Sequence, residues 1–108
     1  MKLTVKEAEI MTVLWNSESP LTTTEIIETS PNRTWQDRSI FVIMRSLLKK
    51  GAVVLDRYKP TAGKHARSYK PLITTEDYVL EVIQDMNESG MKIDVNALAN
   101  RLKKAKEE

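Results

Sequence analysis

The sequence predicts a mainly α-helical protein with one small β-hairpin, and three observations lead to this fold class. Two helix-start motifs of the form T-x-x-E begin at Thr4 and Thr22. A longer helical pattern then ends at Gly51. After this glycine the 3.6-residue period disappears, and β-branched and aromatic residues follow, as is typical of strands.

The first two helices are predicted from capping boxes. In such a box, the side chains of a threonine and of a glutamate three residues later each accept a hydrogen bond from the other residue's backbone N–H. Glu7 completes the box that begins at Thr4, and this helix continues to near Asn16. Glu25 completes the box at Thr22, and the second helix is short because a proline follows it.

The stretch 33–51 is predicted to form one helix with two faces, with Thr34 as its N-cap and Gly51 at its end. The spacing i, i+3, i+4, i+7 of a buried stripe is made by Ile40, Ile43, Met44 and Leu47. At about 100° per residue, the opposite face carries Arg38, Val42, Arg45 and Lys49. That face has three cations and no acid, which suits either the major groove of DNA or a solvated surface.

Residues 52–58 and 65–70 are predicted to be the two strands of a hairpin, with a loop at 59–64. We expect Tyr58 and Tyr69 to pair across the strands. Helices with short connections form a helix-turn-helix, and here a hairpin follows its second helix. The predicted fold is therefore a winged helix-turn-helix.

Two further helices are predicted after the hairpin, the first starting at Thr74 or Thr75 and the second capped by Asp94. Their apolar faces are made by Val79, Val82, Ile83, Met86, Val95, Leu98 and Leu102. An exposed apolar stripe on a small protein indicates a partner, so we expect homodimerisation; the alternative is that these helices fold back onto the chain's own core. The expected division is a winged-helix DNA-binding domain, 1–73, and a short helical dimerisation arm, 74–108.

The charge of the chain is concentrated in its middle. The 108 residues carry a net charge of +2. Residues 33–70 contain ten lysines and arginines and two aspartates, which gives +8 and leaves −6 for the remainder. A basic middle between acidic ends is typical of a polyanion-binding surface, with chance clustering as the alternative.

The composition excludes several kinds of site. Without cysteine there is no disulfide and no thiolate metal or redox site, and one histidine, His65, cannot build a zinc site alone. No apolar run reaches the length of a membrane helix and no signal-peptide pattern is present, so we expect a cytoplasmic protein without a membrane partner. The sequence has no nucleophile–base set, phosphate loop or metal cluster, and we expect neither an enzyme nor a cofactor.

These observations favour double-stranded DNA as the partner. The candidates for contacts with base edges are Arg38, Ser39, Val42 and Arg45. The candidates for contacts with the phosphate backbone are Thr23, Thr34, Trp35, Lys49, Lys64 and Arg67. The alternative is a winged-helix module that binds proteins; the basic middle argues against it, because protein interfaces are depleted in lysine.

Several spaced motifs follow one another in a specific order along residues 3–73. They are Ile10-Met11, Leu14-Trp15, Leu21–Ile26, Trp35 ahead of Ser39-Ile40, Leu47–Gly51 and Tyr69-Lys70-Pro71. This order resembles the penicillinase-repressor family, which includes β-lactamase, methicillin-resistance and copper-responsive repressors. The resemblance implies a dimeric winged-helix repressor that binds palindromic operators, with one helix in the major groove and the hairpin on the backbone.

The sequence departs from that family at three points. Members usually carry an arginine directly before the leucine near the end of the recognition helix, where this chain has Ser46, preceded by Arg45. β-Lactam-linked members are cleaved at an Asn-Phe bond, whereas the only phenylalanine here is Phe41. Copper-responsive members carry a cysteine cluster, and this chain has no cysteine. The inducer, a small molecule or a protease, is left unassigned.

Overall fold

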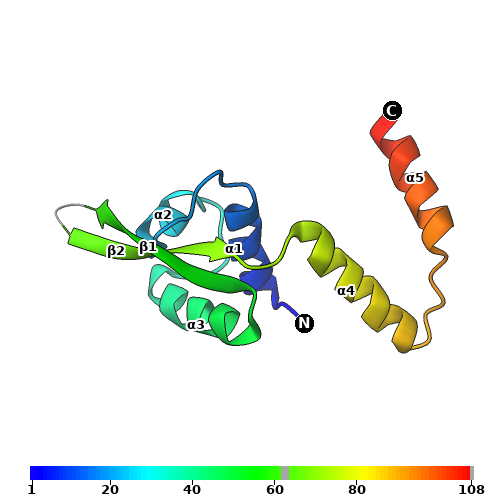
Figure 1. The fold of residues 1–108 in the computed structure, drawn as a ribbon, viewed down its shortest axis with the longest axis horizontal. Helices are drawn as coiled ribbons and strands as arrows, with labels where there is room; N and C mark the ends of the chain where they lie inside the picture. The colour runs from blue at the N-terminus through cyan, green and yellow to red at the C-terminus, as the bar shows by residue number, and fades with distance from the viewer. Residues whose placement is uncertain (62–63, 108) are drawn as a thin grey trace. The chain divides into compact units, whose positions relative to one another are not determined.

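The computed structural model describes residues 1–61 and 64–107, and the side chains of residues 1–60 and 65–107. The contacts divide the chain into two units, Met1–Thr75 and Glu76–Glu108. The elements are α1 (Val5–Trp15), α2 (Thr23–Glu28), the 3₁₀ turn η1 (Asp37–Ser39), α3 (Ile40–Lys50), β1 (Val53–Thr61), β2 (Lys64–Pro71), α4 (Thr75–Glu88) and α5 (Val95–Glu107) (Figure 1).

Both predicted capping boxes are confirmed. At the start of α1, the N–H of Glu7 donates to Thr4 Oγ1 at 3.2 Å, and the N–H of Thr4 donates to Glu7 Oε1 at 2.8 Å. The same pair of bonds joins Thr22 and Glu25 at the start of α2, at 3.2 and 2.9 Å. Each box satisfies two backbone N–H groups that the first turn of a helix would otherwise leave unpaired.

The central helix starts later than the sequence pattern predicts. Thr34 is not its N-cap, because the helical backbone begins with η1 after Gln36, and α3 itself begins at Ile40. Thr34 instead bonds to Glu9 of α1: its N–H donates to Oε1 at 3.1 Å and its hydroxyl donates to Oε2. The predicted end is confirmed, since Gly51 has a φ of +77°, a left-handed conformation that glycine adopts without steric cost.

The hairpin has longer strands than the sequence predicts. Lys59 pairs with Ala66 and Pro60 pairs with His65, so most of the predicted loop at 59–64 belongs to β1 and β2. The two strands pair only with each other over this part of the described hairpin. A proline is tolerated there because each strand has an open edge, where a missing N–H breaks no ladder bond.

The pairing of the two tyrosines is different from the predicted one. Tyr58 lies opposite Arg67, and Tyr69 lies opposite Leu55, because the register shifts between Leu55 and Tyr58. A bulge or similar irregularity changes which residues of the two strands lie opposite each other. The backbone of Tyr69 also bonds in both directions to that of Leu21, at 2.8 and 3.0 Å, which ties the hairpin to the segment before α2.

The core of the N-terminal unit lies where α1 packs against α2, α3 and β2 (Figure 1). The predicted stripe of α3 is confirmed, since Ile40, Ile43, Met44 and Leu47 are all buried. The buried apolar side chains of α1 and α2 are Ile10, Met11, Leu14 and Ile26. Three helices and a hairpin that follows the third one form a winged helix, as the sequence predicts.

The second unit contains most of α4 and all of α5. Asp94 caps α5 as predicted, since the N–H of Ala97 donates to its Oδ1 at 3.0 Å. No residue of α4 or α5, both described over their full length, is buried. The large apolar side chains that are exposed here are Val79, Leu80, Met86, Met91, Val95 and Leu102. Across the described residues, no helix combines the length and apolarity that crossing a bilayer requires.

Candidate nucleic-acid interface

Some basic residues of the segment 33–70 form ion pairs with acidic side chains and others do not. Four have an acidic partner: Arg33 with Asp37, Lys50 with Glu7 at 2.5 Å, Lys59 with Glu25 at 3.0 Å, and Lys70 with Asp56 at 3.5 Å. By contrast, no described acidic side chain forms an ion pair with Arg38, Arg45 or Lys49. Three of the cations without an ion pair among the described residues therefore lie together on η1 and α3.

The outer face of α3 is exposed as its helical spacing predicts. Arg38, on η1, and Arg45 and Lys49, on α3, are exposed, and Val42 between them is 67% exposed. Ser39 is half-buried at the junction of η1 and α3. A helix whose cations project outward from a packed apolar stripe can enter the major groove, where arginine forms paired hydrogen bonds with guanine.

One exposed residue of this face was not predicted from the sequence. Phe41 is 62% exposed, although aromatic side chains usually lie in the core. Its position indicates this exposure, because Phe41 is four residues before Arg45 and three after Arg38, which places it on their side of the helix. The sequence reading followed the buried stripe and the charged stripe, and Phe41 belongs to neither.

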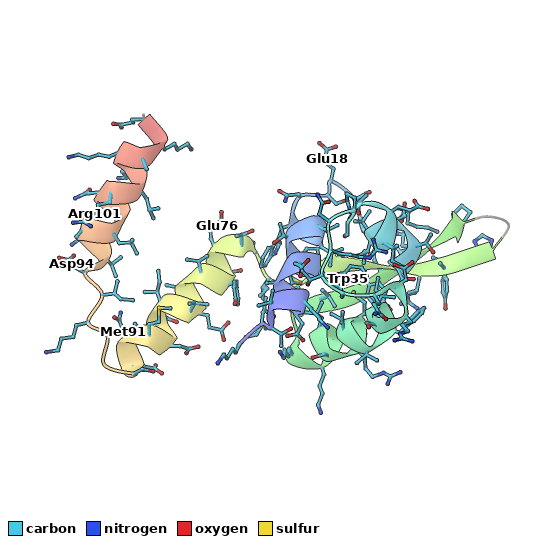
Figure 2. All side chains as sticks on the ribbon, turned by 180° about the vertical axis from the view of Figure 1, so that it is seen from behind. Glu18, Trp35, Glu76, Met91, Asp94 and Arg101 are labelled. Atoms are coloured by element: carbon cyan, nitrogen blue, oxygen red, sulfur yellow. The ribbon has the colours of Figure 1, made fainter. Side chains whose placement is uncertain are left out.

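Trp35 lies inside the N-terminal unit rather than on its surface (Figure 2). Only 3% of it is exposed, so the expected contact of its side chain with the DNA backbone is wrong. The guanidinium of Arg33 lies 5.1 Å from the centre of its ring, and an Arg33 nitrogen donates to the carbonyl of Ser30 at 3.0 Å. Trp35 therefore serves the packing of the segment between α2 and η1.

The remaining backbone candidates lie on α2, on the segment before η1 and on the hairpin. Thr23 is the first residue of α2 and is half-buried. Thr34 is exposed, but its N–H and hydroxyl are bonded to Glu9. Lys64 begins β2, and its side chain lies outside what the structure describes.

The hairpin of β1 and β2, which is the wing of the fold, carries an arginine that stacks on an aromatic ring. The guanidinium of Arg67 lies 5.1 Å from the ring centre of Tyr58, and both residues are exposed. Its Nε donates to the carbonyl of Asp56 at 2.5 Å. The stacking and the hydrogen bond orient the guanidinium while leaving its terminal nitrogens free of an ion pair among the described side chains, as phosphate binding requires. Tyr58 was not expected at this site, because its partner was predicted to be Tyr69.

A buried carboxylate fixes α3 against α1. Glu7 is 3% exposed and accepts hydrogen bonds from Lys50 Nζ at 2.5 Å, Ser46 Oγ at 2.6 Å and the N–H of Thr4 at 2.8 Å. Burial acts to raise the pKa of Glu7, but these hydrogen bonds and the charge of Lys50 lower it to about 2. The sequence predicts only the capping role of Glu7, because its contacts with α3 join residues that are distant in sequence.

This network also accounts for Ser46, which stands where members of the family that the sequence resembles usually have an arginine. The hydroxyl of Ser46 is directed at Glu7, so this position supports the packing of α3 on α1. Arg45, one residue earlier, is exposed. The positive charge of this turn of α3 is therefore presented by Arg45.

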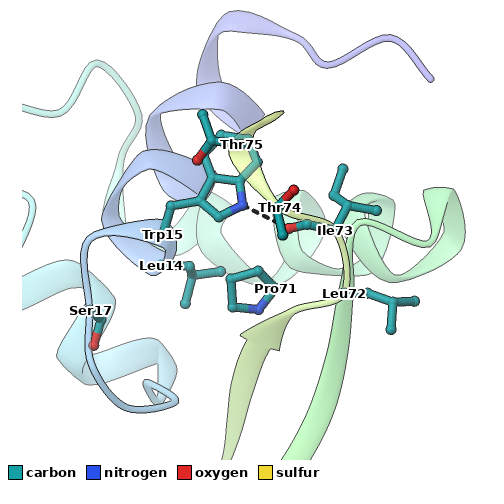
Figure 3. Close-up of a pocket in the computed structure, with 8 residues that line it drawn as sticks. All are labelled: Leu14, Trp15, Ser17, Pro71, Leu72, Ile73, Thr74 and Thr75. Carbon is teal, nitrogen blue, oxygen red and sulfur yellow. Dashed lines mark hydrogen bonds between the residues drawn. The ribbon is translucent and has the colours of Figure 1, made fainter. Parts of the chain in front are cut away.

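An open pocket lies at the end of α1 (Figure 3). The indole N–H of Trp15 donates to the carbonyl of Ile73 at 2.9 Å across one side of it. Leu14, Pro71 and Leu72 line the rest together with serine and threonine side chains. No titratable side chain lines this pocket, and the described residues contain no group of three or more metal-binding side chains.

The chain matches the model of a known protein family. The family model described as penicillinase repressor matches residues 3–107. This range includes α4 and α5 as well as the winged helix, and so extends beyond the residues on which the sequence resemblance rests. A comparison with curated proteins gives no match.

Proposed function

We propose a mode of DNA recognition for this chain. The chain belongs to the penicillinase repressor family and is a DNA-binding transcriptional repressor. In the proposal, α3 enters the major groove of a palindromic operator and the wing of β1 and β2 contacts the sugar–phosphate backbone. Two copies of the chain bind one operator, one on each half-site.

The observation that carries the proposal is the separation of the cations into two groups. The cations that pack against α1, α2 or the base of the wing have acidic partners. Arg38, Arg45 and Lys49 have none among the described side chains. Because phosphate neutralisation dominates the affinity for DNA, the face that retains its charge is the one that meets the polyanion.

Within this face, each residue type suggests a role. Arg38, Ser39, Val42 and Arg45 contact base edges, with arginine bonding to guanine and valine touching a thymine methyl group. Lys49 and Arg67 contact phosphates, together with Thr23, Thr34 and Lys64. Thr34 has to release Glu9 to do so, since its hydrogen-bond donors are occupied in the structure.

The homodimer is supported by the composition of the second unit. Neither α4 nor α5 buries a residue, and helices without a buried face gain little stability in isolation. A second copy of the same helices would cover the apolar side chains at Val79, Val82, Ile83, Met86, Val95, Leu98 and Leu102. A two-fold dimer then matches a two-fold operator.

Fluorescence anisotropy tests this proposal directly. The purified protein is titrated onto a duplex from upstream of its own gene and onto a shuffled duplex, each over a series of salt concentrations. We expect tighter binding to the upstream duplex, with a log–log salt slope of about −0.9 for each phosphate neutralised. Weak and equal binding to the upstream duplex and to duplexes selected from a random pool would contradict the proposal.

A further inference from the structure

Phe41 and Val42 form an exposed apolar pair in the middle of the charged face of α3. They are adjacent in the chain, 62% and 67% exposed, and Phe41 is the only phenylalanine of the protein. Neither side chain contributes to the core, which the neighbouring stripe of Ile40, Ile43 and Met44 provides. Their exposure therefore calls for an occupant outside the N-terminal unit.

The charges around this pair identify the kind of occupant. Arg38 lies one helical turn before the pair and Arg45 one turn after it, with Lys49 a further turn along. All three are exposed, and none has an acidic partner among the described side chains. The complementary surface is a polyanion with apolar groups at its centre. The major groove of DNA fits this description, because the 5-methyl groups of thymine are its only apolar groups.

We propose that Phe41 contacts thymine 5-methyl groups beside Val42 and thereby makes thymine a specific requirement within each half-site. The inference rests on the proposed function, since it requires α3 to lie in the major groove. A phenyl ring packed on this methyl group selects against cytosine, because cytosine lacks the methyl group. Cytosine also presents an amino group that the ring would leave without a hydrogen-bond acceptor.

The test removes only the methyl group from the DNA. A preferred duplex is first selected from a random pool, and each of its thymines is then replaced singly by deoxyuridine, which keeps all hydrogen-bonding groups. We expect the wild-type protein to bind about fourfold more weakly at the contacted positions, the equivalent of one methyl group buried. Binding is measured by fluorescence anisotropy at one fixed salt concentration.

Two variants assign the contact to its residue. Phe41→Ala should lose the deoxyuridine penalty at the thymine that Phe41 contacts and keep the penalty at a thymine that Val42 contacts. It should fold normally because the side chain is exposed, which circular dichroism checks. Lys49→Ala is the matched control on the same helix face: it should weaken binding to both duplexes and keep the fourfold difference between them.

The outcomes separate this inference from the function on which it rests. Selective binding with no deoxyuridine penalty at any thymine overturns the inference and leaves the repressor function intact. Deoxyuridine penalties that are unchanged at every thymine in Phe41→Ala also overturn the assignment. If no duplex from the pool is preferred, the proposed function itself fails. Unchanged binding of Phe41→Ala to every duplex would overturn the inference as well and direct the search toward a protein partner at this face.

Discussion

Glu7 makes two sets of hydrogen bonds, one with a residue close to it in the sequence and one with residues far from it. Its bond with Thr4 caps α1, and that contact spans only three residues. Its bonds with Ser46 and Lys50 of α3 span most of the N-terminal unit and exist only after packing. A buried carboxylate is stable as an ion only when such donors surround it, so Glu7 couples the start of α1 to the end of α3.

The free energy of unfolding should fall as the pH decreases from about 4.5 toward 2. The pKa of Glu7 is about 2 in the folded protein, compared with an ordinary value of 4.5. The folded state therefore binds this proton less readily than the unfolded state does. The stabilisation by ionised Glu7 is complete above the unfolded pKa and is lost as the pH falls through the folded one. Urea denaturation at several pH values measures this dependence.

Two variants identify the group responsible for that acid dependence. Glu7→Gln should remove this part of the pH dependence and cost about 1–3 kcal/mol at neutral pH, because Lys50 loses its charged acceptor. Glu28→Gln, which removes the same charge from an exposed position of α2, should retain the dependence. An acid profile that is the same in wild type and Glu7→Gln would show that other carboxylates control it.

Arg38→Ala should weaken binding to the operator by about 1–3 kcal/mol and relax the base preference, as expected for an arginine bonded to guanine. Lys70→Ala removes an equal charge, but Lys70 is paired with Asp56, so we expect a smaller loss. Anisotropy titrations of both variants on operator and random duplexes measure the difference. Equal losses of Arg38→Ala on the two duplexes would place Arg38 on the backbone instead of on a base.

Arg67→Ala should weaken binding to all duplexes alike and reduce the magnitude of the salt slope by about 1. The reason is that Arg67 lies on the wing, stacked on Tyr58, where a phosphate contact positions the protein without reading a base. Arg67→Lys, which keeps the charge, is the comparison that preserves the salt slope. A change of base preference in Arg67→Ala would contradict a purely positioning role.

At the scale of the helices and strands, contacts that are local in sequence could be predicted. Both capping boxes join residues three apart, so the starts of α1 and α2 follow from the motif alone. Thr34 fits the pattern of an N-cap equally well, but its side chain is hydrogen-bonded to Glu9, 25 residues earlier in the sequence. No local pattern contains such a contact. The tyrosine pairing was wrong for a similar reason, because a shift of register cannot be read from alternation.

The exposed surface of α3 was also predicted only in part, because helical periodicity is local in sequence whereas its ion pairs with other helices are not. Helical periodicity gives the direction of each side chain, and the exposure of Arg38, Arg45 and Lys49 follows from it. It does not reveal which cations are compensated, since the acids of Lys50 and Lys59 come from α1 and α2. Trp35 was assigned to the interface, whereas its burial depends on packing between segments that are distant in sequence.

Removal of the cap of α2 should lower the stability of the winged helix. Thr22 is fully buried and accepts the N–H of Glu25, so Thr22→Ala should cost about 0.5–2 kcal/mol. Thr24→Ala, an exposed change within the same helix, is the control and should cost little. Chemical denaturation monitored by tryptophan fluorescence measures both. Equal stability of the two variants would show that the capping box contributes nothing beyond helix propensity.

At the scale of the whole molecule, the two units differ in how they gain stability. The N-terminal unit has a core built by three helices and the hairpin, and the buried polar side chains of Glu7 and Thr22 are hydrogen-bonded within it. The helices α4 and α5 have amphipathic sequences and bury no residue. Their stability and their orientation should therefore depend on the second copy that we propose, and so should the spacing of the two winged helices.

Ile83→Glu should convert the protein to a monomer, because Ile83 lies on the apolar face of α4 that the second copy would cover, and a buried carboxylate without a partner opposes association. Gln84→Glu introduces the same charge at the neighbouring, exposed position and should leave the dimer intact. Size-exclusion chromatography with light scattering measures the mass of each variant. The monomer should bind an isolated half-site as the wild type does, yet lose affinity for the full operator, since the second half-site is no longer bound from a high effective concentration. A dimeric Ile83→Glu, or a monomeric wild type at concentrations that saturate the operator, would show that DNA is bound without the proposed arm contact.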